Sequence, residues 1–220
     1  MVVMENDQRG QDEAQRRSHV ASVSAAPGQL ELVRAFVNTL DIEAGTDELA
    51  SPAAVDRWLR ARGLITAEQG GARREVSAQA AVDADLRDAI TVREGLRAVL
   101  RAHVDPANAS GGSGSRPGTV TRLGDITARL PARLALADDG RLTMVPATSG
   151  VKGGLAGILL IASEAAIAGS WARLKVCSAD DCQWAFYDRS PTRNGCWCSM
   201  AVCGSRAKSR NYRRRVADRR

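Results

Sequence analysis

The sequence has few aromatic side chains, because phenylalanine, tyrosine and tryptophan together make up 4% of its 220 residues. Its hydrophobic content is nevertheless 44%, which is too high for an intrinsically disordered chain. The core must therefore be built mainly from alanine, leucine, valine and isoleucine. This length allows one domain of ordinary size, or one domain with a small satellite.

Histidine and the familiar catalytic motifs are also scarce. The chain has two histidines, His19 and His103, and it contains no glycine-rich phosphate loop, no paired-carboxylate motif and no nucleophile elbow. His103 stands at the end of a predicted helix, where we expect either a solvent-exposed side chain or a helix C-terminal cation rather than a catalytic base. These absences predict that the protein is not an enzyme.

The sequence lacks a long uninterrupted apolar run. Its most apolar stretch, "GLAGILLIASEAAIAG" from Gly154, is broken by Ser163 and Glu164 and falls short of the roughly 20 apolar residues that span a membrane. The first twenty residues are polar and do not have the apolar centre of a secretory signal. We expect a buried helix at Gly154 and a cytoplasmic, nucleoid-associated protein without a membrane partner.

The apolar residues that are present recur mostly at helical spacing. Helices are predicted over 29–41, from Ser51-Pro52 to Gly63, over 77–103, over 120–130 and from Gly154, while Asp139-Gly140 marks a hairpin between two alternating segments. The predicted fold class is mainly α (α+β). A disordered leader over 1–27 precedes a multihelical domain over 28–170 that contains one small antiparallel hairpin. Its predicted core includes Trp58, Leu86, Ile90 and Leu159.

Five cysteines lie within one 27-residue window, at positions 177, 182, 196, 198 and 203. Four of them form two equal pairs, Cys177-x4-Cys182 and Cys198-x4-Cys203, separated by fifteen residues. Two short loops that each offer two thiolates suit a tetrahedral Zn²⁺ site. Incidental buried cysteines, a disulfide and an iron–sulfur cluster remain as alternatives. Cys196 is two residues from Cys198, so its side chain points the opposite way on an extended segment, and we expect a free thiol.

The positive charge is concentrated at the C-terminus. Residues 204–220 carry a net charge of +7, whereas the remaining 203 residues carry −1. A helix that starts near Ser199 would align part of this charge in one stripe beside Tyr212, which suits contact with nucleic-acid phosphates. The alternative is a solvated tail that only aids solubility. The predicted nucleic-acid-binding residues are Arg206, Lys208, Arg210, Tyr212, Arg213, Arg214 and Arg215.

Two polar residues interrupt an otherwise apolar helical segment, Asn38 and Thr39. Such side chains usually form hydrogen bonds with nearby backbone. The alternative is that they line a ligand pocket. The sequence leaves both interpretations open.

The segment "VCSADDCQWAFYDRSPTRNGCWCSMAVCGSRAKSRNYRRR" resembles the CGNR-type zinc finger. In that family a C-x4-C pair is followed by W-C-S-M-x-x-C-G-N-R and a basic helix. Here Trp197 to Met200 and Cys203 to Arg206 match, and Ser205 replaces the motif asparagine. Upstream, "FVNT" from Phe36 and "VDRWLRARGL" from Val55 resemble the ABATE-like domain that is usually fused to this finger.

This resemblance implies a zinc knuckle with a basic helix over 171–220, which holds one structural Zn²⁺ per chain through Cys177, Cys182, Cys198 and Cys203. It also implies a transcriptional regulator that binds double-stranded DNA, with the N-terminal domain as a sensor or partner-binding unit. RNA polymerase or another transcription factor is a further expected partner, and homodimerisation is left open. The alternative function is a protein-interaction module that docks on an acidic protein surface without reading DNA.

Overall fold

The computed structural model describes residues 25–65, 83–104 and 118–217. Within these ranges the chain forms six α-helices and three short antiparallel hairpins, so the predicted mainly α (α+β) class is confirmed. The helices are α2 (Leu30–Val37), α3 (Pro52–Ala61), α4 (Asp83–Ala102), α5 (Thr119–Thr127), α6 (Gly150–Ile167) and α7 (Ser205–Ala217).

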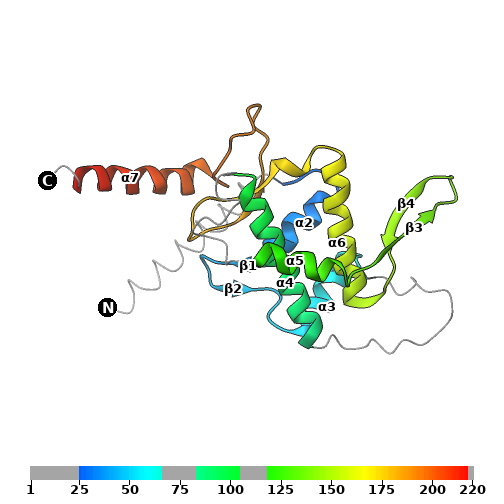
Figure 1. Cartoon of the computed structure of the whole chain (residues 1–220). Helices are drawn as coiled ribbons and strands as arrows, with labels where there is room; N and C mark the ends of the chain where they lie inside the picture. Colours follow the sequence, from blue (N-terminus) through cyan, green and yellow to red (C-terminus); the bar gives the residue numbers. More distant parts are fainter. Residues whose placement is uncertain (1–24, 66–82, 105–117, 218–220) are drawn as a thin grey trace.

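Each sheet is a two-stranded hairpin. Strand β1 (Leu40–Asp41) pairs with β2 (Thr46–Asp47), and β5 (Leu174–Val176) pairs with β6 (Ala185–Tyr187). The hairpin predicted at Asp139-Gly140 consists of β3 (Ala132–Leu136) and β4 (Leu142–Pro146), and Leu134 lies opposite Met144 in its register. Figure 1 shows this hairpin projecting from the side of the molecule opposite to α7.

The start of α3 follows from its sequence. The Ser51 hydroxyl accepts a hydrogen bond from the Ala54 N–H at 3.2 Å, and Pro52 occupies the first helical position, where a missing N–H costs nothing. The helix ends before Gly63, whose φ of +68° suits glycine. Val55, Trp58 and Leu59 face the core as predicted.

Helix α6 lies at the centre of the body, and nine of its residues are buried. By length and composition it is the one described helix that qualifies as a candidate membrane span, with a mean hydropathy of 1.5. Half of its residues are buried against the rest of the protein, and Leu155 and Ile158 are fully enclosed. These contacts are those of the core helix predicted from the sequence.

Helix α4 presents a different face to the core than the sequence pattern indicated. Leu96 is buried and Leu86 packs at the edge of the core as predicted, but Ile90 is only half-buried. Arg93 and Arg97 take the inward positions, with 2% and 4% exposure. Both guanidinium groups find acceptors on neighbouring elements.

These acceptors lie on α2 and the β1–β2 hairpin. Arg93 donates to Asp47 at 2.7 Å and to Thr39 at 3.3 Å, and Arg97 donates to the Val37 carbonyl at 2.6 Å. Burial lowers the pKa of Arg97, and Glu94 offsets part of that effect. A fixed guanidinium geometry that serves several acceptors makes such burial tolerable.

The main apolar core extends past the predicted boundary at residue 170. Leu174, Val176, Ala185 and Tyr187 of the β5–β6 hairpin belong to the same buried cluster as α2, α3, α4 and α6. A second, smaller cluster contains Cys177, Ala179, Cys182, Phe186, Cys198 and Cys203. The β5–β6 hairpin therefore has one side in the body core and carries the cysteine cluster at its turn.

Other predictions fall on parts of the chain outside the described residues. These are the leader over 1–24, the first turns of the helix predicted from residue 77, the glycine-rich connection over 105–117 and the last three residues.

Candidate metal centre and basic helix

Four cysteines from two separate loops meet in one buried cluster. Cys177 and Cys182 lie in the turn between β5 and β6, while Cys198 precedes and Cys203 lies within the π-helical turn Met200–Gly204 that leads into α7. Their Sγ atoms all lie within 4.8 Å of one another, and all four side chains are buried. The two cysteine pairs predicted from their spacing therefore converge on a single site.

The sulfur spacing fits a tetrahedral zinc ion. Zn–S bonds of about 2.3 Å give a tetrahedron whose S–S edges are about 3.8 Å. The Cys182–Cys198 and Cys198–Cys203 sulfur distances are 3.6 and 3.7 Å. Four thiolates complete the coordination shell, so the ion held here is a structural one without an open position for substrate.

The crowding of four thiols changes their ionisation. Hydrogen bonds from Cys182 and Cys198 lower the pKa of Cys177, and the corresponding interaction with Cys177 raises the pKa of both donors. The direction of the shift at Cys177 is toward the thiolate. This is the form that coordinates Zn²⁺.

The loop between the two cysteine pairs is held by a buried ion pair that the sequence pattern did not reveal. Lys175 Nζ lies 2.8 Å from Asp188 Oδ2, and their side chains are 3% and 4% exposed. Asp188 also accepts hydrogen bonds from the Ser190 and Gly195 amides, and Lys175 donates to the carbonyls of Arg193 and Gly195. Each remaining polar atom is satisfied, which a buried ion pair requires.

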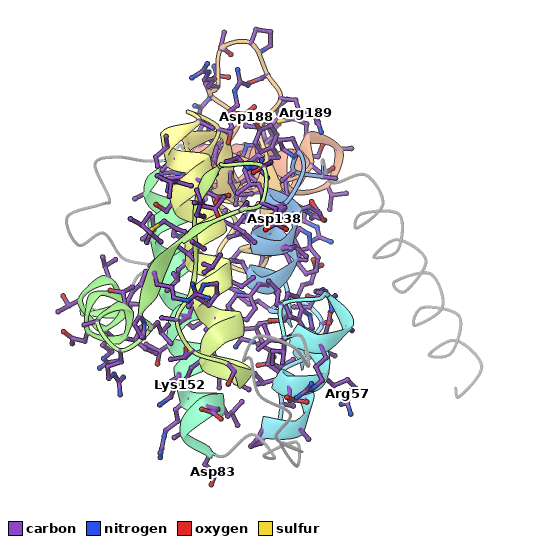
Figure 2. All side chains as sticks on the ribbon, turned by 90° about the vertical axis from the view of Figure 1, so that its right-hand side faces the viewer. Arg57, Asp83, Asp138, Lys152, Asp188 and Arg189 are labelled. Atoms are coloured by element: carbon purple, nitrogen blue, oxygen red, sulfur yellow. The ribbon has the colours of Figure 1, made fainter. Side chains whose placement is uncertain are left out.

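This ion pair also lowers the pKa of Asp188. Burial opposes ionisation of Asp188, but the hydrogen bonds from Lys175 and Ser190 hold the pKa of the carboxyl well below its usual range. In Figure 2, Asp188 and Arg189 lie at the opposite end of the molecule from Asp83, where α4 begins. The finger is therefore packed at the C-terminal end of α4. The sequence offers one signal for the Lys175–Asp188 pair, which is a lysine inside an otherwise apolar strand.

Cys196 lies outside the four-cysteine cluster. Its side chain is half-buried and forms no disulfide. Its carbonyl accepts a hydrogen bond from the Ser178 amide at 2.9 Å, which ties the second cysteine loop to the first. The free thiol predicted at this position agrees with the structure.

The helix α7 begins directly at the metal centre. The Ser199 hydroxyl accepts a hydrogen bond from the Val202 amide, and the Gly204 amide donates to the Ser199 carbonyl. A Cβ at Gly204 would lie 3.0 Å from Met200 Sδ, so glycine permits this close turn. Ser205, which replaces the motif asparagine, donates to the Met200 carbonyl.

The predicted nucleic-acid-binding side chains all lie on this exposed helix. None of its residues is buried, and Tyr212 is 70% exposed. Figure 1 shows α7 projecting away from the body. The helix therefore presents its positive charge to solvent along its length.

Two of the α7 arginines are tied to acidic residues of the rest of the protein. Arg206 pairs with Glu43 at 2.8 Å, and this hydrogen bond raises the pKa of Arg206. Arg210 lies 3.7 Å from Asp181. Within the described ranges, no ion-pair partner is found for Lys208, Arg213, Arg214 and Arg215.

A shallow pocket of about 530 Å³ runs beside the first turns of α7. Positive side chains and hydroxyl groups make up most of its polar lining. It is lined by Ala201, Val202, Ser205, Arg206, Ser209, Arg210 and Arg213.

Asn38 and Thr39 form hydrogen bonds inside the protein. The Asn38 amide donates to the Ala185 carbonyl at 2.9 Å and accepts from the Ala185 N–H at 2.7 Å. Thr39 donates to the Phe36 carbonyl. Asn38 therefore joins α2 to strand β6 of the finger. The ligand pocket, which the sequence left open as the alternative role of these two residues, stays untested.

His103 differs from its predicted exposed position. It is half-buried, its Nδ1 lies 2.8 Å from the Leu174 carbonyl, and its ring packs edge-on against Trp171 at 5.5 Å. Burial lowers its pKa, so the ring is favoured in the neutral form. The predicted solvent exposure was wrong because the β5 strand packs over the end of α4, and the lowered pKa also disfavours the alternative of a helix C-terminal cation.

Comparison with known protein families gives two matches that meet at the start of β5. The CGNR zinc finger matches residues 173–216, which contain the four-cysteine cluster and nearly all of α7. The family described as "Putative stress-induced transcription regulator" (ABATE) matches residues 30–174. A comparison with curated proteins finds no match. The second family match covers more than half of the chain, and the protein therefore belongs to the ABATE family of transcription regulators and carries a C-terminal CGNR zinc finger.

Proposed function

We propose that this protein is a transcription regulator that binds double-stranded DNA through α7, with the zinc centre fixing the start of that helix. The observation that carries the proposal is the direct succession of a buried tetrathiolate site and an exposed, strongly basic helix. Cys203 lies in the turn Met200–Gly204, and α7 begins at Ser205, two residues after this cysteine. A helix anchored at one end can hold cationic side chains against phosphates in a fixed geometry.

The charges of α7 divide into two groups with different roles. Arg206 and Arg210 are paired with Glu43 and Asp181 and orient the helix on the protein. Exposed ion pairs of this kind are weak, so both arginines can still share their charge with a phosphate. The four remaining cations, Lys208, Arg213, Arg214 and Arg215, supply the main phosphate contacts.

The pocket beside α7 supports a phosphate-binding role for Arg213 and for the two paired arginines, Arg206 and Arg210, which also line it. Ser205 and Ser209 are on the same lining as the arginines, and hydroxyl groups commonly add hydrogen bonds to phosphate oxygens. Tyr212 is exposed among the cations, where an aromatic ring can contact a sugar or a base. The proposed DNA surface therefore combines charge, hydroxyl groups and one aromatic side chain.

The N-terminal domain acts in this proposal as the sensor or partner-binding unit. Two contacts support such coupling, because Asn38 holds Ala185 of the finger and Glu43 holds Arg206 at the start of α7. The proposal places the protein in the cytoplasm at the nucleoid, gives it no catalytic activity and leaves RNA polymerase or another transcription factor as a second partner.

The test is a salt titration of binding to a random-sequence duplex. If about five phosphates are neutralised, log K should fall against log salt with a slope of roughly −4 to −5. Arg213→Ala should flatten this slope by about 1. Arg206→Ala, which also removes the ion pair with Glu43, should show a flattening no larger than that of Arg213→Ala.

Arg57→Ala is the matched control. Arg57 is an exposed arginine on α3, and its replacement changes the net charge by the same amount as Arg213→Ala. Figure 2 shows it at the end of the molecule far from Asp188 and Arg189 of the finger. Its slope should equal that of the wild type. Wild-type protein that fails to bind duplex DNA at low salt would contradict the proposal and favour the protein-interaction function.

A further inference from the structure

Helix α4 carries a row of three arginines at four-residue spacing, Arg93, Arg97 and Arg101. Residues four apart lie on the same face of a helix. At the start of the row, Arg93 bonds to Asp47 of the body. At its other end, Arg101 Nη2 lies 2.6 Å from Asp180 Oδ1, in the turn of the first cysteine pair. The row therefore runs from the body to the loop that carries two of the zinc ligands.

Arg97 occupies the middle of this row and is held against the finger. Its Nη2 donates to the Val37 carbonyl at 2.6 Å. The next residue, Asn38, forms two hydrogen bonds with the backbone of Ala185, three residues after Cys182. Arg97 is therefore fixed beside the segment that leads out of the first cysteine pair.

The guanidinium groups of this row are not all satisfied. Among the described residues, the buried Nη1 atoms of Arg97 and Arg101 find no hydrogen-bond acceptor. Glu94 bonds to Arg93 at 2.8 Å and lies 3.5 Å from Arg97 Nε, so it leaves Nη1 of Arg97 without an acceptor. No nitrogen of Arg93 is left in this state. A buried N–H without an acceptor is costly, and more so on a charged group, so a negative group near Arg97 and Arg101 would stabilise both.

The zinc centre is a negative group at this end of α4. Four thiolates carry more negative charge than one Zn²⁺ carries positive charge, and the cluster is buried, where charges are screened weakly. Burial lowers the pKa of Arg97, and the negative charges that counteract this effect include Glu94 and Cys182. Zinc binding removes the thiol protons, so a nearby cation stabilises the zinc-loaded cluster more than the zinc-free one.

We propose that Arg97 is the counter-cation that the N-terminal domain supplies to the zinc tetrathiolate, on the Cys182 side of the site. Arg101 acts in the same way from the next turn of α4 and also holds the loop through Asp180. Arg97 is not a ligand but a positioning residue, whose charge acts on the metal through the Cys182 thiolate. Retention of zinc by the finger then depends on α4 of the body, and a change that moves α4 away from the loop weakens the metal site.

The zinc affinity of the full chain, measured by competition with a chromophoric chelator, tests this role. Arg97→Gln removes the charge and keeps a donor for the Val37 carbonyl. It should bind zinc about 10–100-fold more weakly, which is the usual effect of losing a partner just outside the ligands. Arg97→Lys keeps the charge and should restore part of the affinity.

Arg93→Gln is the matched control, because Arg93 is as deeply buried on the same face of α4, and it should retain the wild-type affinity. Equal losses in Arg97→Gln and Arg93→Gln, or an Arg97→Lys that binds no better than Arg97→Gln, overturn the proposal.

The cobalt-substituted protein separates the charge of Arg97 from its packing. Tetrathiolate Co²⁺ has a thiolate-to-metal charge-transfer band, whose energy falls when a nearby cation is removed because the sulfur electrons become easier to transfer. Arg97→Gln should therefore shift this band to longer wavelength, while the ligand-field bands that report tetrahedral geometry stay in place. An unchanged charge-transfer band in Arg97→Gln would leave this residue with a structural role only and overturn the proposal.

Arg101→Gln covers the case in which Arg97→Gln does not fold. The Arg101 side chain is 20% exposed, so the body should tolerate its replacement with unchanged helical circular dichroism. The cobalt band should shift in the same direction by a smaller amount. Asp180→Asn breaks the same ion pair but keeps the cation, and it should give no shift to longer wavelength. Equal shifts in these two variants, or none in Arg101→Gln, overturn the proposal. Because the readouts are zinc affinity and a metal spectrum, their failure is distinct from failure of DNA binding.

Discussion

The two buried clusters of this protein are held together by different forces. The body cluster joins α2, α3, α4 and α6 through leucine, isoleucine, valine and alanine side chains that are excluded from water. The cysteine cluster has six buried residues, of which four are thiol ligands. A cluster of this size cannot offset the loss of chain entropy by apolar burial alone, so the metal supplies much of its folding free energy.

This difference also divides the C-terminal segment itself. The β5–β6 hairpin has its apolar side chains in the body cluster and its turn in the cysteine cluster. Removal of zinc should therefore release the turns and the start of α7 while the strands stay packed. Zinc binding is therefore needed for the placement of α7 and much less for the folding of the body.

The largest expected effect comes from removal of a zinc ligand. Replacement of Cys177, Cys182, Cys198 or Cys203 by Ser removes a zinc ligand and should abolish stoichiometric zinc. The C-terminal module should then unfold, because structural Zn²⁺ binding contributes about 10–16 kcal/mol in isolated fingers. Elemental analysis measures the metal, and circular dichroism should show that most body helix remains.

Cys196→Ser is the matched control and should keep full zinc, because this residue is outside the cluster. Loss of metal in Cys196→Ser together with full zinc in Cys198→Ser would contradict the ligand assignment. Unfolding of the whole chain on chelation would instead show that both clusters form one cooperative unit.

The buried ion pair should have the next largest effect. Lys175→Met leaves Asp188 buried without its cation, which should lower the free energy of unfolding by about 3–5 kcal/mol. Chemical denaturation with zinc present measures this change. Asp56→Asn, which breaks an exposed pair with Arg60, should cost under about 1 kcal/mol, and an equal loss in both variants would contradict the role of burial.

Asn38→Ala tests the connection between the clusters. It removes both hydrogen bonds to the Ala185 backbone and leaves buried polar groups unpaired, at a cost of about 1–3 kcal/mol each. Thermal unfolding followed separately by helical circular dichroism, which comes mainly from the body helices, and by zinc release should show two transitions that move apart. Transitions that remain superimposed would mean that Asn38 does not couple the two regions.

The smallest expected effect concerns pH. The pKa of His103 is lowered in the folded state by burial, so the unfolded chain binds the proton more readily. The stability linked to His103 is therefore present above a pH of about 6.5 and declines as the pH falls below that value. His103→Gln should flatten the dependence of the unfolding free energy between pH 7.5 and 5.5, and a steeper dependence would contradict the assignment.

More of the zinc site than of the packing around it could be predicted from the sequence. Cysteine spacing identifies the ligand set because metal coordination depends on a few local residues, and the Ser51-Pro52 signal identifies the start of α3 for the same reason. Buried Arg93 and Arg97, the Lys175–Asp188 pair and the Asn38–Ala185 bonds depend on partners far apart in the chain. Charged residues in a periodic pattern normally indicate a solvent face, which is why the inward face of α4 was misplaced at Ile90.

The central claim is that zinc places α7 for DNA binding rather than merely adding charge. The direct measurement is the affinity for a random duplex of the zinc-loaded wild type and of Cys203→Ser, at about 100 mM salt. Both proteins have the same arginines, and the zinc tetrathiolate itself contributes negative charge, so loss of zinc does not weaken the electrostatic attraction of the tail. We predict that Cys203→Ser binds at least about tenfold more weakly and with a shallower salt slope. Equal affinity and equal slope in the two proteins would contradict the account.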